Sequence, residues 1–146
     1  MFQFRFQSVL DYRKTVEEKR HSEFSGQREL LEERIAGLES LRAERSRQME
    51  TLRAMDRIKV SPSDVSCLSA YILSLRERET QEEGIISKMR SDLEEKRKEL
   101  VEAMRQRKVM EKLRERHFGE FQASEEKQEN NQLDEFGVTR FRMREP

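Results

Sequence analysis

The chain has 146 residues, of which 41% are charged and 34% hydrophobic, and thirty acidic side chains balance thirty basic ones. This composition is typical of coiled coils and long helices, and it excludes a broad globular core. The zero net charge provides no global field that would attract nucleic acid or an acidic membrane. No apolar run approaches the roughly 18 residues that a membrane span requires.

The chain opens with an alternation of apolar and polar side chains, in which Phe2, Phe4 and Phe6 are separated by Gln3 and Arg5. This alternation is unlike the apolar block of a signal peptide, so we expect a cytosolic protein, or a peripheral one on the cytosolic side. Helical patterning follows within the first ten residues, and no proline interrupts it before Pro62. The sequence therefore predicts a first helix over about residues 4–58.

Apolar residues recur along this first helix at heptad spacing and form a broad stripe, in which Arg45 also takes a position. The apolar members of the stripe are Phe24, Leu31, Ile35, Leu38, Leu41, Met49, Leu52 and Met55.

The segment 59–64 is the only clear break in the helical pattern. Pro62 removes an amide donor and disfavours helix at Ser61. Either Ser61 or Ser63 can cap a following helix, and Asp64 favours the positive end of its dipole. The chain is predicted to turn here and to continue as a second helix over about residues 64–126.

The second helix carries a seam in steps of three and four residues, sustained for over six heptads. Ten of its fourteen positions are apolar, which predicts a supercoiled helix that needs a partner and argues against a disordered chain. The positions are Val65, Leu68, Ile72, Leu75, Glu79, Glu82, Ile86, Met89, Leu93, Lys96, Leu100, Ala103, Arg107 and Met110.

A turn near position 60 makes antiparallel helices pair residues whose numbers sum to roughly 121 or 122. Ile86 then faces Ile35, and Leu93 faces residues 27–31. The acidic seam positions Glu79 and Glu82 fall opposite Leu41, Arg42 and Arg45. Opposed charges at the same height predict control of the register.

The predicted fold is all-α: a long antiparallel two-helix coiled-coil hairpin over residues 1–128, followed by a flexible tail over residues 129–146. Each arm is expected to extend roughly 75 Å, with both chain ends together. That common end is expected to be aromatic and basic. Residues 105–116 carry six bases against two acids, and the aromatic residues there are Phe2, Phe4, Phe6, Phe118 and Phe121.

Basic residues near a helix C-terminus are expected from the helix dipole, and no groove-reading motif accompanies them, so we expect no nucleic-acid partner. Motifs of catalysis are missing as well: there is no glycine-rich phosphate loop, no serine elbow and no cysteine cluster. The single cysteine, Cys67, excludes an intrachain disulfide and is expected to be at least half-buried beside the seam.

His21 and His117 would lie about 25 Å apart and cannot share a metal. We therefore expect no enzyme activity, no cofactor, no metal site and no small-molecule substrate.

Two terminal motifs resemble those of a known family. The opening Phe4-Arg5-Phe6-Gln7-Ser8-Val9-Leu10-Asp11-Tyr12-Arg13 resembles the N-terminal Phe-Arg-Leu-Gln-x-Val-Leu signature of the FliJ family, the helical-hairpin component of the bacterial flagellar export apparatus. The segment Leu133-Asp134-Glu135-Phe136 through Met143-Arg144-Glu145-Pro146 is similar to the family's C-terminal element. The length and the single central break also agree with the family.

The resemblance implies a non-catalytic stalk, similar in fold to the γ-type subunit of rotary ATPases. Its terminal end would enter the hexameric flagellar export ATPase and promote assembly and activity of that enzyme. The residues implied in ATPase interaction are Phe4, Phe6, Leu10, Arg13, Lys108, Lys112, Arg116, Asp134, Glu135 and Phe136.

The resemblance also implies contact of the turn with the cytosolic part of the membrane export gate, handling of export chaperones, and a cytoplasmic location at the inner membrane. Tyr71 is the sharpest candidate for the gate because it lies one position off the seam. The implied gate residues are Met49, Leu52, Met55, Leu68, Tyr71 and Leu75. Two alternatives stay open: the equivalent stalk protein of a virulence type III injectisome, and a purely structural coiled coil that dimerises through its seams.

Overall fold

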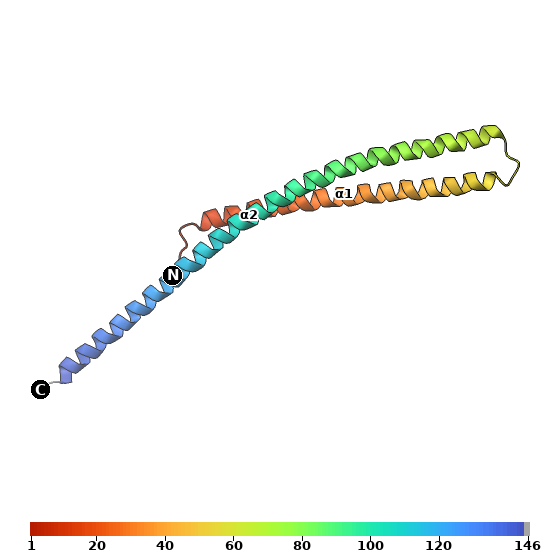
Figure 1. The fold of residues 1–146 in the computed structure, drawn as a ribbon. Helices are drawn as coiled ribbons and strands as arrows, with labels where there is room; N and C mark the ends of the chain where they lie inside the picture. The colour runs from red at the N-terminus through yellow and green to blue at the C-terminus, as the bar shows by residue number, and fades with distance from the viewer. Residues whose placement is uncertain (145–146) are drawn as a thin grey trace. The chain divides into compact units, whose positions relative to one another are not determined.

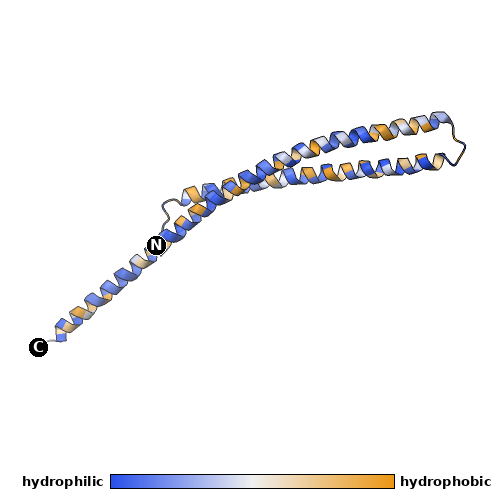
Figure 2. Cartoon of the chain, viewed as in Figure 1, coloured by the Kyte–Doolittle hydropathy of each residue, from blue (hydrophilic) through white to orange (hydrophobic). Residues whose placement is uncertain are grey.

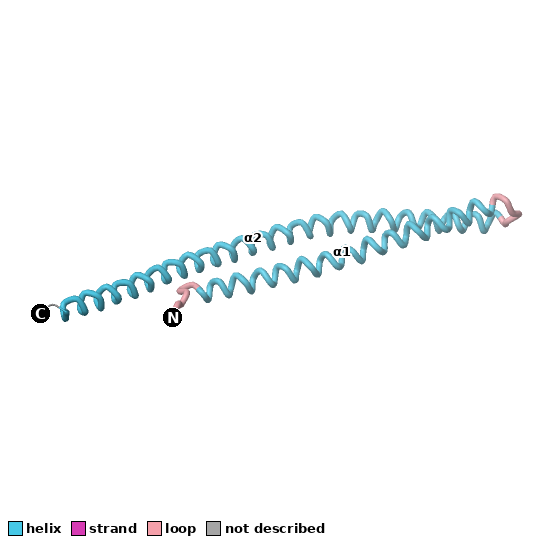
Figure 3. The backbone as a smooth tube through the Cα atoms, turned by 90° about the horizontal axis from the view of Figure 1, so that it is seen from below, coloured by secondary structure: helices cyan, strands magenta, loops and turns pink. Residues whose placement is uncertain are grey.

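The computed structural model describes residues 1–144, which form two long helices. Helix α1 spans Gln7–Met55 and helix α2 spans Pro62–Arg144, and no strand occurs within the described residues. The helices lie side by side in two perpendicular views and are joined by a single connection (Figures 1 and 3). The predicted all-α helical hairpin is confirmed.

Contacts divide the chain into two units. The terminal unit consists of Met1–Lys19 and Val101–Pro146, and the turn unit consists of Arg20–Leu100. Each unit pairs a stretch of α1 with a stretch of α2, and each is described below by itself.

The predicted seam is the buried line of both units. Every seam position of α2 from Val65 to Met110 is buried or half-buried. In the turn unit, Leu31, Leu38 and Ile86 form a buried cluster, and three further side chains pack against it: Ile35, Met89 and Leu93. Hydrophilic residues dominate the rest of both helices, with hydrophobic ones recurring at short intervals (Figure 2). Because burial of one aliphatic side chain contributes roughly 1.5–3 kcal/mol, a row of such contacts stabilises the pair.

The four charged positions of the seam all bind oppositely charged side chains of α1. Arg45 Nε donates to Glu79 Oε1 at 3.1 Å, and Glu79 is only 6% exposed. The other pairs are Arg34 with Glu82 at 3.0 Å, Glu23 with Lys96 at 3.6 Å, and Glu17 with Arg107. These pairs agree with the predicted register, except that Glu82 binds Arg34 while Arg42 binds Glu83 at 2.9 Å.

The connection between the helices is capped as the sequence predicts. Ser61 Oγ accepts a hydrogen bond from the Ser63 N–H at 3.3 Å, and the Ser61 carbonyl accepts one from the Asp64 N–H at 3.1 Å. Pro62 is the first residue of α2, where its missing amide proton costs nothing. On the other side of the connection, α1 ends at Met55. The Met55 carbonyl accepts a hydrogen bond from the N–H of Ile58, three residues later, at 3.2 Å, which closes a turn.

Two expectations differ from the structure. The sequence predicts that the second helix ends near 126, but α2 continues to Arg144 with its side chains exposed from Gln122 on. Glu, Gln and Lys are good helix formers and no proline intervenes before the end of α2, so the helix continues without packing. Flexibility of residues 129–144 in solution stays a prediction, and positions 145–146 lie outside the described residues.

Cys67 is exposed, so the expectation of a half-buried thiol is wrong. Position 67 immediately precedes the seam residue Leu68, and two helices cover only the seam itself.

The pair of Arg45 and Glu79 yields a test of the seam. Replacing Arg45 by Met leaves a buried carboxylate without its guanidinium, so we expect the free energy of unfolding to fall by about 2 kcal/mol. Urea unfolding followed by circular dichroism measures the loss. The matched control is Arg42→Met, because Arg42 and Glu83 are 51% and 52% exposed and their pair is worth about 0.5 kcal/mol at most. Equal losses in both variants would contradict a special role of the seam pair.

Candidate functional site

Aromatic side chains close the terminal unit. The residues before α1 fold against α2, with the Gln7 N–H bound to the Phe4 carbonyl at 3.1 Å. The Phe2 ring meets the Phe118 ring edge-on at 5.2 Å between centroids, and it lies 5.5 Å from the Phe121 ring. Phe4 packs edge-on against His117 at 5.6 Å. The predicted aromatic closure is confirmed.

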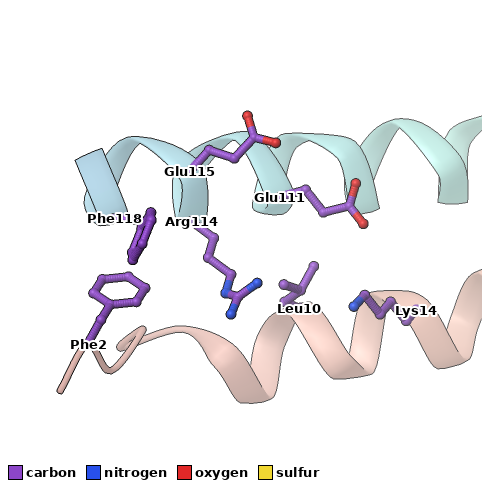
Figure 4. A pocket seen from close by; sticks show the side chains of 7 residues that line it. All are labelled: Phe2, Leu10, Lys14, Glu111, Arg114, Glu115 and Phe118. Atoms are coloured by element: carbon purple, nitrogen blue, oxygen red, sulfur yellow. The ribbon is translucent and has the colours of Figure 1, made fainter. Parts of the chain in front are cut away.

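A pocket of about 330 Å³ lies beside these rings (Figure 4). The Arg114 side chain points from α2 toward α1, between Phe2 and Leu10, whereas the Glu115 carboxylate points away from α1. The lining residues are Phe2, Leu10, Lys14, Glu111, Arg114, Glu115 and Phe118. Sequence reasoning missed this pocket, because heptad spacing locates the seam and not the gaps at its edge.

Some of the basic side chains in the terminal unit are used within the hairpin. Arg107 binds Glu111 at 2.7 Å and also binds Glu17, and these hydrogen bonds raise the pKa of its guanidinium. Arg13 donates to Gln106 at 2.6 Å. These side chains hold α1 and α2 together and are half-buried.

A second set of cations forms an exposed face. Lys108, Lys112 and Arg116 follow one another at intervals of four residues, so they lie on one side of α2, and all three are exposed. Among residues 1–144, the only ion pair of Arg116 is with Glu120, one turn further along, at 3.4 Å. These three side chains of the predicted ATPase surface are therefore accessible to a partner.

The other residues predicted for ATPase interaction differ in accessibility. Phe4 and Leu10 are 8% and 1% exposed, which gives them a packing role in the hairpin. Phe6 is partly exposed, with the Arg5 guanidinium 5.7 Å from its ring centroid. The three tail residues are exposed: Asp134, Glu135 and Phe136.

The residues predicted for the gate lie in the turn unit, where most of them are at least half-buried between α1 and α2. Leu75 is buried, and Met49, Leu52, Met55 and Leu68 are half-buried. Tyr71 is 41% exposed, as its position off the seam predicts. Sequence reasoning missed Ile58 and Leu73, which are 67% and 59% exposed; the available signal was a large apolar residue outside the heptad positions.

Within residues 1–144, no cluster of three or more potential metal ligands occurs. No helix in this part of the chain is both long and apolar enough to cross a membrane.

The fold defines a two-helix coiled-coil protein with exposed basic and apolar side chains outside its seam. A family model described as Flagellar FliJ protein matches residues 2–146, while no curated protein and no solved structure matches. Because the match covers essentially the whole chain, this protein belongs to the FliJ family and is a component of the flagellar export apparatus. Members of the family are non-catalytic.

A titration tests the local electrostatics beside Tyr71. The Glu44 carboxylate accepts hydrogen bonds from Arg47 first and Gln48 second, with a smaller contribution from the Tyr71 hydroxyl, and these hold its pKa below the ordinary 4.5. We expect Arg47→Gln to raise the pKa of Glu44, measured by NMR of the side-chain carboxyl. A lowered folded pKa means that the stabilisation is complete above pH 4.5 and is lost as pH falls through the folded value.

Glu94 provides the internal reference for this titration, because its pKa is lowered by Arg97 and not by Arg47. Its pKa is expected to stay unchanged in the variant. An unchanged pKa of Glu44 would show that Arg47 is not its main partner in solution.

Proposed function

We propose that this chain is the coiled-coil stalk of the flagellar export apparatus and that its terminal unit inserts into the hexameric export ATPase. There it promotes assembly and activity of the ring. The observation that carries the proposal is the exposed basic face of Lys108, Lys112 and Arg116 in the same unit as the aromatic chain end. Family membership supports the same assignment.

The physical chemistry of the terminal unit suits such a role. Its aromatic end is packed before any partner arrives, so little conformational entropy is lost on binding. Exposed cations accelerate association with an oppositely charged surface and fix its orientation, and their effect is weakened by salt. The seam residues are already buried against each other within one chain, which favours this proposal over a structural dimer held by the seams. The flagellar description of the matching family favours it over the injectisome alternative.

The turn unit is proposed to contact the cytosolic part of the membrane export gate, which would place the protein at the cytoplasmic face of the inner membrane. Tyr71 is the proposed anchor, and the exposed side chains of Leu73 and Ile58 add apolar surface in the same unit. Aromatic anchors of this kind contribute strongly to interfaces. Export chaperones are the third proposed class of partner.

The test of the stalk proposal is ATP hydrolysis by the purified export ATPase with and without this protein, together with ring formation seen by electron microscopy. We expect the rate to rise with ring formation. In the variant Lys108→Glu, Lys112→Glu, Arg116→Glu, the concentration needed for half-maximal stimulation should increase about tenfold or more, because the steering charge is reversed.

The matched control reverses three exposed cations of the turn unit, Lys88→Glu, Arg90→Glu and Lys98→Glu, and should stimulate like the unmodified chain. No stimulation by the unmodified chain at any concentration would overturn the stalk proposal. Equal losses in the two triple variants would mean that overall charge, and not the basic face, is responsible.

The gate proposal is tested by Tyr71→Ala. We expect binding to the cytosolic part of the gate to weaken by about 1–2 kcal/mol, measured by calorimetry, with helicity unchanged. Tyr12→Ala is the control, since Tyr12 is 62% exposed but lies in the terminal unit. Loss of helical structure in Tyr71→Ala would instead show that the ring packs within the hairpin.

A further inference from the structure

The last part of α2, residues 122–144, is a helix without a cover. All of its side chains are exposed, and it runs past the start of the chain with no other described segment beside it (Figures 1 and 3). Helices in proteins are stabilised mainly by burial of one face against a neighbour. A partner that covers one face of this segment would therefore stabilise it.

One side of the segment carries apolar side chains at heptad spacing. Phe136 follows Leu133 by three residues and Met143 follows Phe136 by seven, so the three lie on one side of the helix. They are 70%, 66% and 83% exposed for Phe136, Leu133 and Met143. Arg140 takes the heptad position between Phe136 and Met143. An uncovered stripe of this kind is typical of one strand of a coiled coil.

The charges on this side are separated along the helix. Glu129 precedes Leu133 by four residues and Glu126 precedes Glu129 by three, so both carboxylates share the side of the apolar residues. Arg140 lies at the other end, four residues after Phe136. Neither Glu129 nor Arg140 has an ion pair among residues 1–144. The resulting tail face is acidic at one end, apolar in the middle and basic at the other; it consists of Glu126, Glu129, Leu133, Phe136, Arg140 and Met143.

The remaining charges of the segment belong to other sides of the helix. At about 100° per residue, Asp134 and Glu135 are rotated by roughly 100° and 200° from Leu133, and Arg142 is rotated by roughly 180°. These three side chains therefore do not contribute to the tail face.

A second copy of the tail face, running in the opposite direction, is complementary to the first. In the antiparallel register that pairs Leu133 with Phe136, the same heptad spacing pairs Glu129 with Arg140. Both contacts occur twice, because a two-fold axis relates the two copies. The two apolar layers are then flanked at each end by a pair of opposite charges.

Other arrangements of two tail faces lack this match. A shift by one heptad places Glu129 opposite Leu133, or Arg140 opposite Phe136, depending on its direction. A parallel pair in register places Glu129 beside Glu129 and Arg140 beside Arg140, and like charges that face each other are destabilising. The order of residues on the face thus selects a single antiparallel register.

We propose that residues 126–143 of two copies of this chain pair as an antiparallel coiled coil and make the protein a dimer. Leu133 of each copy packs against Phe136 of the other, and Glu129 of each copy forms an ion pair with Arg140 of the other. Because only two apolar layers are buried, the dimer forms at micromolar concentrations or above.

The pairing leaves both hairpins intact. In this register Met143 of one copy lies opposite Glu126 of the other, so the contact ends before Phe121, whose ring packs against Phe2 at 5.5 Å. Each tail therefore has room for a partner helix without displacing the start of the chain. The proposal does not depend on the ATPase contact, although it covers Phe136.

The test is sedimentation equilibrium of the full chain, with a reductant present because Cys67 is exposed. Glu129→Arg and Arg140→Glu each turn two attractive contacts of the dimer into repulsive ones, so each variant should self-associate about tenfold more weakly or worse. An equimolar mixture of the two variants should form a heterodimer. The double variant Glu129→Arg, Arg140→Glu exchanges the two charges and should dimerise like the unmodified chain.

The matched controls make equal changes on other sides of the same helix. Glu135→Arg and Arg142→Glu repeat the two charge reversals and should dimerise like the unmodified chain. Phe136→Ala should weaken dimerisation, whereas Phe141→Ala should not, although the two rings are almost equally exposed at 70% and 69%. Circular dichroism checks that every variant keeps its helices.

A chain that stays monomeric at all concentrations overturns the proposal. So does a dimer of unchanged strength in Glu129→Arg and Arg140→Glu, because association would then use another surface or a parallel arrangement. A helical double variant that fails to recover dimerisation also contradicts the pairing of Glu129 with Arg140.

Discussion

A pair of helices can cover only one stripe on each partner, and this constraint decides the role of almost every residue in the chain. On the seam, Ile72 is 7% exposed; one position away, Tyr71 is 41% exposed and Leu73 is 59% exposed. The apolar residues that hold α1 and α2 together are therefore not available to partners, and the apolar residues available to partners contribute little to the fold. Partner surfaces can be substituted in this architecture with small effects on stability, which makes the interaction proposals accessible to mutagenesis.

An apolar seam alone would hold two helices together in several registers, because a slip of seven residues again matches apolar with apolar. The charged positions remove this ambiguity. A slip of one heptad would place Glu79 near Leu38 or Leu52 in place of Arg45, and a buried carboxylate would lose its guanidinium. Breaking buried pairs in this way costs several kcal/mol, whereas a pair in place adds little to net stability. The buried pair of Arg45 and Glu79 thus contributes specificity of register more than strength.

Sequence reasoning succeeded where the information lies in spacing. The heptads predicted the buried seam, the position of the turn predicted a register in which Glu79 meets Arg45, and Ser61 with Pro62 predicted the start of α2. Sequence reasoning failed for residues whose burial depends on contacts with distant parts of the chain. Phe4 and Leu10 belong to a motif at the chain start, and their burial depends on how the residues before Gln7 fold against α2. The end of α2 was missed because helix propensity sustains a helix that nothing covers.

The tail of α2 is best understood from the phase of its apolar residues. If the heptad positions of the seam are extended along α2 beyond His117 and Phe121, they fall on Glu135, Val138 and Arg142. The exposed side chains of Leu133, Phe136 and Met143 fall at other heptad positions, so a longer α1 would not cover them. Their stripe is therefore exposed and available to a partner other than α1. The acids of this segment precede its arginines along the helix. A complementary surface therefore carries positive charge opposite Leu133 and none opposite Met143, where the arginines of α2 would repel it. That asymmetry distinguishes a specific protein surface from a uniformly charged membrane or polyanion.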